Sequence, residues 1–206
     1  MILKDFAEKK ADILIGTQMI VKGHDFPAVS LIGVVLADLS LYSSTYKSSE
    51  ETFQLISQAV GRAGRADIPG KAVIQTYQPD DFAIVTASSQ DYESFYNEES
   101  TYRMLMDYPP YKEMLGIICT GSSEQKTEAA LSHIASLIRK IDGKDRLHTI
   151  GPAFMPVKKI RDKYRAAVYL RSDNHKVLLE VCDRVKAYID VNKGFKDLDI
   201  SYDFNI

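Results

Sequence analysis

The sequence of 206 residues contains no glycine-rich phosphate loop of the Gly-x-x-x-x-Gly-Lys-Ser/Thr type. It also contains no Asp-Glu-x-His box, the acidic motif that holds magnesium and orients water in nucleotide hydrolysis. These two absences exclude a self-contained ATPase of the phosphate-loop class. We therefore expect that this chain does not hydrolyse ATP by itself.

Cysteine is scarce, and long apolar runs are absent. Cys119 and Cys182 stand far apart, which excludes a disulfide framework and a zinc cluster within these residues. This usage is typical of a reducing compartment, here expected to be the cytoplasm. No apolar run approaches about 18 residues, so we expect no membrane span. The histidines lack metal-ligand spacing, and we expect no metal site.

Charge is unevenly distributed along the chain, although the net charge is only −2. Residues 1–107 contain 9 Lys and Arg against 15 Asp and Glu, whereas residues 108–206 contain 17 against 13. A change of sign halfway along a chain indicates two domains with different partners. The basic half is the better candidate for direct contact with a phosphate backbone.

The most informative motif is the run Gln58-Ala59-Val60-Gly61-Arg62-Ala63-Gly64-Arg65. On a helix, Arg62 and Arg65 would lie on the same side, about one turn apart. Gly61 and Gly64 each cost about 1 kcal/mol relative to alanine in a helix, which predicts that something approaches the backbone closely. Two forked guanidinium groups beside them predict bidentate binding of a polyphosphate. The alternative is a solvated helix with two surface arginines.

A second motif precedes the first by about forty residues and spans residues 13–27. An apolar run leads into Gly16-Thr17, and a Lys-Gly-His-Asp string follows at residues 22–25. A buried strand that ends in small and polar residues is how α/β folds place a ligand at the carboxyl edge of a sheet. Thr17 offers a hydroxyl, Gly23 allows close backbone approach, and Asp25 offers an acceptor for a ribose hydroxyl.

These two motifs, in this order and spacing, resemble motifs V and VI of superfamily 2 helicases. With the segments Tyr108-Pro109-Pro110-Tyr111 and Ile150-Gly151-Pro152-Ala153, the chain resembles the PriA family of replication-restart helicases over nearly its whole length. The resemblance implies the C-terminal part of a longer ATP-dependent 3′-to-5′ DNA helicase. Such a helicase restarts stalled replication forks and supports primosome assembly.

The resemblance also implies roles for individual residues. Arg62 and Arg65 would face the γ-phosphate of ATP, and Gln58 would contact the nucleotide or relay the closure of the two lobes. Gly23, Asp25 and Gly61 would help to bind the nucleotide, and Thr17 and Lys22 would contact DNA. Lys22 stands where many relatives have arginine. Lysine keeps the positive charge but lacks the forked guanidinium group, which weakens the case for bidentate phosphate binding by this residue.

Cofactors and partners follow from the same resemblance. It implies ATP and Mg in the full-length protein, and Zn bound by cysteines that are absent from these residues. It implies DNA, either forked or single-stranded, as the main partner. Primosome proteins and the single-stranded DNA binding protein are further implied partners, and no membrane is expected.

Residues 1–107 alternate between strand and helix patterns. Continuous apolar runs predict a parallel sheet, and the alternation predicts a RecA-like helicase lobe that lacks its beginning. The predicted strands are 12–17, 31–39 and 72–77, and the predicted helices begin near Ser49 and Asp81 and span 91–107. We expect the tyrosines at 92, 96, 102 and 108 to pack in the core or between lobes.

Paired prolines at 109 and 110 end the last of these helices, and we place the domain boundary between residues 107 and 108. Residues 108–206 read as a small α+β domain with the order β-α-β-β-α-β of a ferredoxin-like fold. The predicted elements are strand 114–121, helix 124–141, two strands within 148–172, helix 175–191 and strand 198–205.

A cluster of cations lies between the two middle strands of this domain. Clustered Lys and Arg with an aromatic residue suit phosphate contact and base stacking. The cluster contains Lys158, Lys159, Arg161, Lys163 and Arg165, with Tyr164 among them. The alternative is a solvated hairpin tip whose lysines protect a sheet edge.

Two other functions remain open from the sequence. The first is another superfamily 2 translocase, such as a RecG-like or chromatin-type enzyme. The Gly-Thr-Gln string at residues 16–18 and the Tyr-Pro-Pro-Tyr segment argue against it. The second is a stand-alone module that binds nucleic acid or docks a protein without any motor.

Overall fold

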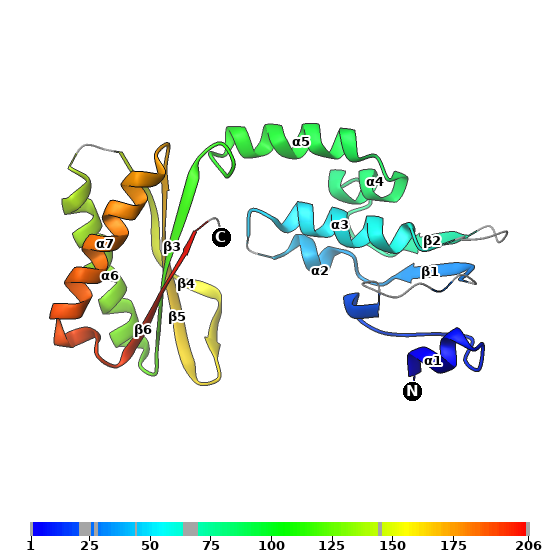
Figure 1. The fold of residues 1–206 in the computed structure, drawn as a ribbon, viewed down its shortest axis with the longest axis horizontal. Helices are drawn as coiled ribbons and strands as arrows, with labels where there is room; N and C mark the ends of the chain where they lie inside the picture. The colour runs from blue at the N-terminus through cyan, green and yellow to red at the C-terminus, as the bar shows by residue number, and fades with distance from the viewer. Residues whose placement is uncertain are drawn as a thin grey trace. The chain divides into compact units, whose positions relative to one another are not determined.

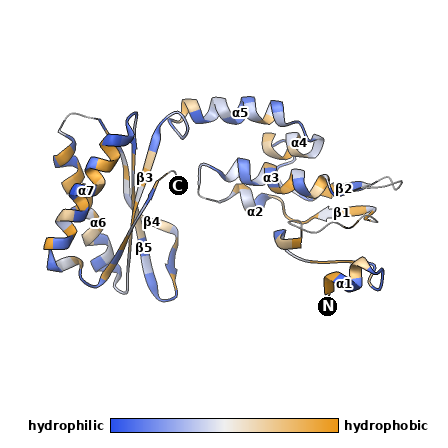
Figure 2. Ribbon diagram, viewed as in Figure 1, coloured by the Kyte–Doolittle hydropathy of each residue, from blue (hydrophilic) through white to orange (hydrophobic). Residues whose placement is uncertain are grey.

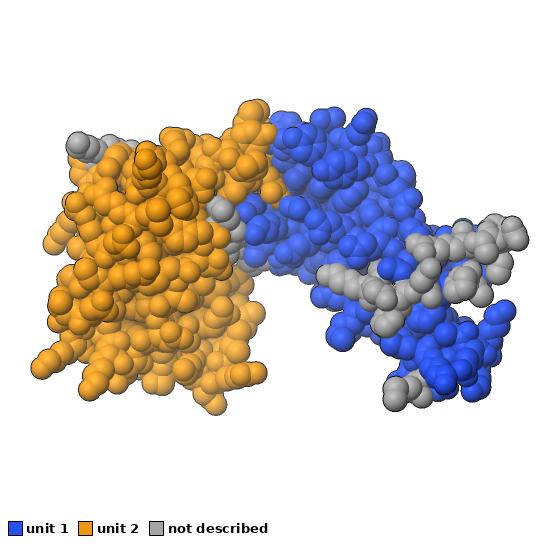
Figure 3. All heavy atoms as spheres, viewed as in Figure 1, with its two compact units in different colours: residues 1–101 blue, residues 102–206 orange. Residues whose placement is uncertain are grey.

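The computed structural model describes residues 2–20, 26, 29–43, 45–63, 70–143 and 146–204. The chain forms two compact units, residues 1–101 and 102–206 (Figure 3). This division falls within helix α5 (Tyr92–Leu105), whereas the sequence pattern places the boundary at Tyr108. The first unit contains a parallel sheet and the second an antiparallel sheet, so the chain is an α/β lobe followed by a small α+β domain.

The first unit is built around two parallel strands (Figure 1). Its elements are α1 (Ile2–Ala7), a 3₁₀ turn (Gln18–Ile20), β1 (Leu31–Val34), α2 (Asp38–Leu41), α3 (Ser48–Val60), β2 (Lys71–Ile74), α4 (Phe82–Ser89) and the first part of α5. Leu31 lies opposite Lys71 and Val34 opposite Ile74, which confirms the predicted parallel pairing. The helix predicted to begin near Asp81 is α4, and Asp81 caps it, because its side chain accepts a hydrogen bond from the backbone N–H of Ala83 at 2.9 Å.

Two strand predictions are wrong in this unit. Residues 13–17 form no strand, and Ile13 and Ile15 are 78% and 90% exposed. A strand exists only where its backbone pairs with a neighbour, and neither β1 nor β2 pairs with these residues. The strand predicted over 31–39 ends at Val34, because Leu36 has a φ of 55° and Asp38 begins α2.

The core of the first unit is a contact between helices. Phe53 and Ile56 of α3 pack against α4, and Phe95 of α5 stacks on Phe53 with ring centroids 4.2 Å apart. Helix α3 begins at Ser48, which confirms the helix predicted to begin near Ser49. Tyr92 and Tyr96 are 63% and 56% exposed, so they do not pack in the core of this unit, and packing between lobes stays a prediction.

The second unit has the predicted ferredoxin-like order. Its elements are β3 (Glu113–Gly121), α6 (Glu124–Asp142), β4 (His148–Ile160), β5 (Lys163–Ser172), α7 (His175–Val191), a 3₁₀ turn (Lys193–Phe195) and β6 (Leu198–Phe204). The strands follow the spatial order β4-β5-β3-β6, and every pair is antiparallel. No helix in the part of the chain that the structure describes is long and apolar enough to cross a membrane.

Helices α6 and α7 lie on one face of this sheet (Figure 1), and both alternate between hydrophobic and hydrophilic residues along their length (Figure 2). Ile134 and Ile138 of α6 are fully buried against the sheet, as the helical spacing predicts. The strands contribute Leu115, Ile117, Val168 and Leu170 to the same core, and each of these is fully buried.

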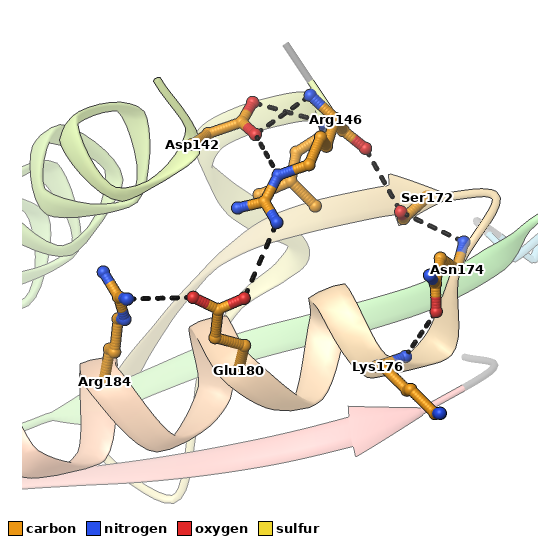
Figure 4. Close-up of polar contacts among 8 residues, drawn as sticks. Asp142, Arg146, Ser172, Asn174, Lys176, Glu180 and Arg184 are labelled. Carbon is orange, nitrogen blue, oxygen red and sulfur yellow. Dashed lines mark hydrogen bonds and ion pairs between the residues drawn. The ribbon is translucent and has the colours of Figure 1, made fainter. Parts of the chain in front are cut away.

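A polar network holds Arg146 and Leu147, just before β4, against α6 and α7 (Figure 4). The carboxylate of Asp142 accepts hydrogen bonds from the backbone N–H of Arg146 at 3.0 Å and of Leu147 at 3.2 Å. The Arg146 guanidinium lies 3.6 Å from Glu180 of α7, which also pairs with Arg184 at 2.9 Å. Asp142 is only 8% exposed, so these bonds satisfy a carboxylate that burial would otherwise destabilise.

Candidate nucleotide and nucleic-acid sites

The carboxyl ends of β1 and β2 lie at the same edge of the parallel sheet, where α/β folds bind ligands. Asp38 follows β1, and Thr76 and Tyr77 follow β2. Thr76 Oγ1 donates a hydrogen bond to Asp38 Oδ1 at 2.7 Å, and the backbone N–H of Tyr77 lies 3.1 Å from both carboxylate oxygens. Asp38 is 1% exposed, so its carboxylate joins the two strand ends from inside the fold.

Competing effects set the pKa of Asp38. Burial alone would raise it, because the charged form loses its water. The hydrogen bonds from Thr76 and from the backbone N–H of Tyr77 outweigh this effect and hold the pKa below its ordinary value of 3.8. Sequence reasoning missed this residue by placing it inside a strand; a carboxylate directly after an apolar run was the available signal.

The arginine-glycine motif begins at the end of α3. The helix ends at Val60, and the backbone N–H of Arg62 bonds to the carbonyl of Ala59 at 3.0 Å in a turn. The prediction that Arg62 lies on a helix is therefore wrong, because glycines at 61 and 64 are poor helix formers. Gln58 is exposed on the last turn of α3, Arg62 is half-buried, and Arg65 lies outside the described residues.

Gly61 has a neighbour that explains the absence of a side chain. A Cβ at this position would lie 3.1 Å from Gln90 Nε2 and 3.2 Å from the carbonyl oxygen of Ser57. Gln90 Nε2 donates to that carbonyl at 3.4 Å. The close approach to the backbone that the glycine predicted is thus made here by a glutamine side chain.

The upstream motif is described only in part. Thr17 lies in an exposed loop, and its carbonyl accepts a hydrogen bond from the backbone N–H of Ile20 at 3.0 Å. Phe26 contacts Phe6 of α1 edge to face, with ring centroids 5.0 Å apart. The predicted contact residues Lys22, Gly23 and Asp25 lie outside the described residues.

The basic cluster forms the tip of the hairpin between β4 and β5, as predicted. Ile160 pairs with Lys163, and the two turn residues Arg161 and Asp162 have φ of 47° and 62°. Two successive residues with positive φ are typical of the tight type I′ turn, whose twist matches that of the strands. The turn is therefore regular, whereas the pairing of β4 with β5 below it is interrupted by a register shift between Phe154 and Lys159.

The five cations of this hairpin differ in how they are paired. Lys158 Nζ lies 2.6 Å from Glu124 Oε1 on α6, and Lys159 Nζ lies 3.0 Å from Asp162 Oδ1. The hydrogen bond to Asp162 and its negative charge raise the pKa of Lys159. Arg161, Lys163 and Arg165 make no ion pair within the residues that the structure describes. These three cations are therefore the ones available to an anionic ligand.

The described residues do not fit a zinc site. Cys119 and Cys182 are 0% and 2% exposed in the core of the second unit, and burial raises the pKa of Cys119 to about 11. Zinc binds the thiolate, which this environment disfavours. Across the described ranges, no group of three or more His, Cys, Asp and Glu side chains could hold a metal ion.

Comparison with known proteins matches both units. Residues 1–67 match the helicase conserved C-terminal domain, and residues 104–204 match the primosomal protein N C-terminal domain. The chain is 38% identical over 206 residues to replication restart protein PriA of Bacillus subtilis (strain 168), 36% to that of Chlamydia pneumoniae and 32% to that of Synechocystis sp.. These alignments cover 99%, 93% and 93% of this chain, and 25%, 27% and 24% of the relatives.

The two matches together define a class of proteins in which a helicase C-terminal domain precedes a primosomal C-terminal domain. The chain belongs to the PriA family of replication restart proteins, and it matches their C-terminal part. It spans about a quarter of the length of the curated relatives that it matches.

The lowered pKa of Asp38 predicts an acid-sensitive contribution to stability. Because the folded pKa lies below the unfolded one, this contribution is complete above about pH 4 and is lost as the pH falls through the folded value. We expect Asp38→Asn to lower the melting temperature at neutral pH, and the difference from the parent chain to shrink below about pH 4.

Thermal melts of the full chain between about pH 7 and pH 2.5 measure this effect. Asp80→Asn, at an exposed position near the same sheet edge, is the matched control and should change little at any pH. A melting difference for Asp38→Asn that stays constant into acid would contradict the assigned direction of the pKa shift.

Proposed function

We propose that this chain is the C-terminal part of an ATP-dependent 3′-to-5′ DNA helicase that restarts stalled replication forks and supports primosome assembly in the cytoplasm. The two family matches and the PriA relatives support this proposal. In it, the first unit completes a nucleotide site whose phosphate loop lies elsewhere in the full-length protein. The second unit contacts DNA.

ATP and magnesium would supply the phosphoryl chemistry in the full-length protein. The guanidinium groups of Arg62 and Arg65 would stabilise negative charge on the γ-phosphate, which is the task of an arginine finger. Gln58 would contact the nucleotide beside them. Five further residues would complete the motor contacts: Gly23, Asp25 and Gly61 toward the nucleotide, and Lys22 with Thr17 toward DNA.

The hairpin between β4 and β5 is the observation that carries the DNA part of this proposal. Arg161, Lys163 and Arg165 lie within five residues of one another without a carboxylate partner among the described residues. Phosphate contacts of this kind fix the position of a nucleic acid without reading its sequence. They would hold forked or single-stranded DNA while the motor lobe acts on it.

Primosome proteins and the single-stranded DNA binding protein are the proposed protein partners. The zinc that the family implies would be bound outside these residues, since neither cysteine here suits it. A stand-alone nucleic-acid-binding module would also use the basic hairpin, but it would have no need of the arginine-glycine motif at residues 58–65. The length of the PriA relatives, about four times that of this chain, favours the motor.

In the full-length protein, Arg62→Ala and Arg65→Ala should each lower DNA-stimulated ATP turnover by about 10³-fold or more, the usual effect of losing an arginine finger. DNA affinity should stay nearly unchanged. Steady-state ATPase assays with single-stranded DNA test this, and the chain of residues 1–206 serves as a control without turnover. Losses below about tenfold for both variants would assign these arginines a structural role.

The hairpin predicts which charges determine the salt dependence of DNA binding. Each phosphate neutralised adds about −0.9 for duplex DNA, or about −0.7 for a single strand, to the slope of log affinity against log salt. We expect the triple variant Arg161→Asn, Lys163→Gln and Arg165→Gln to lose about 2 to 3 units of slope. Asparagine is used at position 161 because it tolerates the positive φ of the turn.

The double variant Lys158→Gln and Lys159→Gln is the matched control for this measurement. Both lysines already pair with carboxylates, so we expect a smaller change per charge removed. Fluorescence anisotropy at several salt concentrations gives both slopes. A triple variant that keeps its slope would show that the hairpin is a solvated tip.

A further inference from the structure

The sheet of the second unit has one face without helices. Both α6 and α7 lie on the other face (Figure 1). Along the central strand β5, Val168 and Leu170 are fully buried in the core beneath these helices. Successive side chains of a strand point to opposite faces. The alternate residues Lys163, Arg165 and Tyr169 therefore lie on the face away from the helices.

The strand register defines what surrounds Tyr169 on this face. Gly116 of β3 lies opposite it on one side, and Ile150 of β4 lies opposite it on the other. The next row along the sheet carries Ile118 of β3 beside Ala167. A glycine, an alanine and two isoleucines therefore border the Tyr169 ring on this face, and Tyr169 itself is half-buried.

The positive and the negative side chains on this face lie on different strands of the sheet. Lys163 and Arg165 occupy the hairpin end of β5, and neither has an ion pair among the described residues. The carboxylates of Asp199 and Asp203 stand on the outer strand β6, which pairs with β3 and not with β5. Two strand spacings, about 10 Å, therefore separate them from β5, which is about one Debye length at physiological salt.

Two further observations define the limits of this surface. Arg171, at the far end of β5, donates a hydrogen bond to the carbonyl of Met106 at 2.5 Å and lies 4.5 Å from the ring centroid of Tyr108. The Arg171 side chain is therefore already engaged by Met106 and Tyr108, which precede β3. Burial raises the pKa of Tyr169, and the positive charge of Arg165 opposes this rise.

We propose that this face of the sheet binds single-stranded DNA, with a base stacked on Tyr169 and phosphates held by Lys163 and Arg165. The inference rests on the proposed DNA contact of the hairpin and extends it from phosphates to bases. Four-stranded α+β sheets can present aromatic side chains of their central strands to unstacked bases. Stacking of this kind tolerates any sequence, because every base has a π-face. A duplex keeps its bases paired and stacked, so it cannot occupy Tyr169 in this way.

The absence of tryptophan from the chain provides a direct test. Tyr169→Trp introduces a single indole, whose fluorescence should fall in a saturable manner when an oligothymidylate of about 12 nucleotides binds. Tyr96→Trp, at a position that is 56% exposed on α5 in the first unit, is the matched control and should show no such fall. A blunt duplex of the same length should leave the Tyr169→Trp signal unchanged.

Affinity provides the second measurement. Tyr169→Ala should weaken binding of the oligothymidylate to the full chain by about 5- to 150-fold, the range measured for loss of one stacked base. Tyr169→Phe keeps the ring and should bind within about twofold of the parent. Melting temperatures of the variants show whether the fold is retained. If Tyr169→Ala does not fold, the Tyr169→Trp experiment still tests the inference.

The outcomes separate this inference from the proposed function. Binding without quenching of Tyr169→Trp, or equal quenching by duplex, would overturn the inference and leave the hairpin contact standing. An unchanged salt slope in the hairpin triple variant would overturn the hairpin contact instead. If the chain binds no single-stranded DNA at all, both fail.

Discussion

The strict alternation of side chains along β5 is the constraint on which the account of the second unit depends. Val168 and Leu170 are fully buried beneath α6 and α7, and slipping the register by one residue would expose both. The hydrophobic core therefore also determines where Arg165 and Tyr169 lie. The same physical requirement that closes one face of the sheet directs a cation and an aromatic ring to the other face.

The first unit depends on a different interaction at the carboxyl edge of its sheet. Two short parallel strands leave their ends close together, and the buried carboxylate of Asp38 joins them through Thr76 and the backbone of Tyr77. In the proposed motor, this edge would support the nucleotide and DNA contacts of the family motifs. A charged group that is buried and fully hydrogen-bonded keeps such an edge in one arrangement.

Much of the second unit could be predicted because its local signals agree. Helix α7 spans the predicted residues, with Asn174 capping it and its apolar residues at helical spacing. The ion pair of Lys158 with Glu124 could not be predicted, because it joins residues that only the folded sheet brings together. The strand predicted at 12–17 failed because an apolar run does not reveal whether a neighbouring strand is present. The arginine-glycine motif indicated the family, but its glycines ended the helix before Arg62.

Photocrosslinking tests the central claim, that the hairpin and the adjoining sheet face contact single-stranded DNA. The full chain would be irradiated with an oligonucleotide that carries bromodeoxyuridine in place of thymidine, and the adducts would be mapped by mass spectrometry of peptides. We expect adducts on β5 between Lys163 and Tyr169. Adducts confined to α6 and α7, on the opposite side of the same sheet, would contradict this claim.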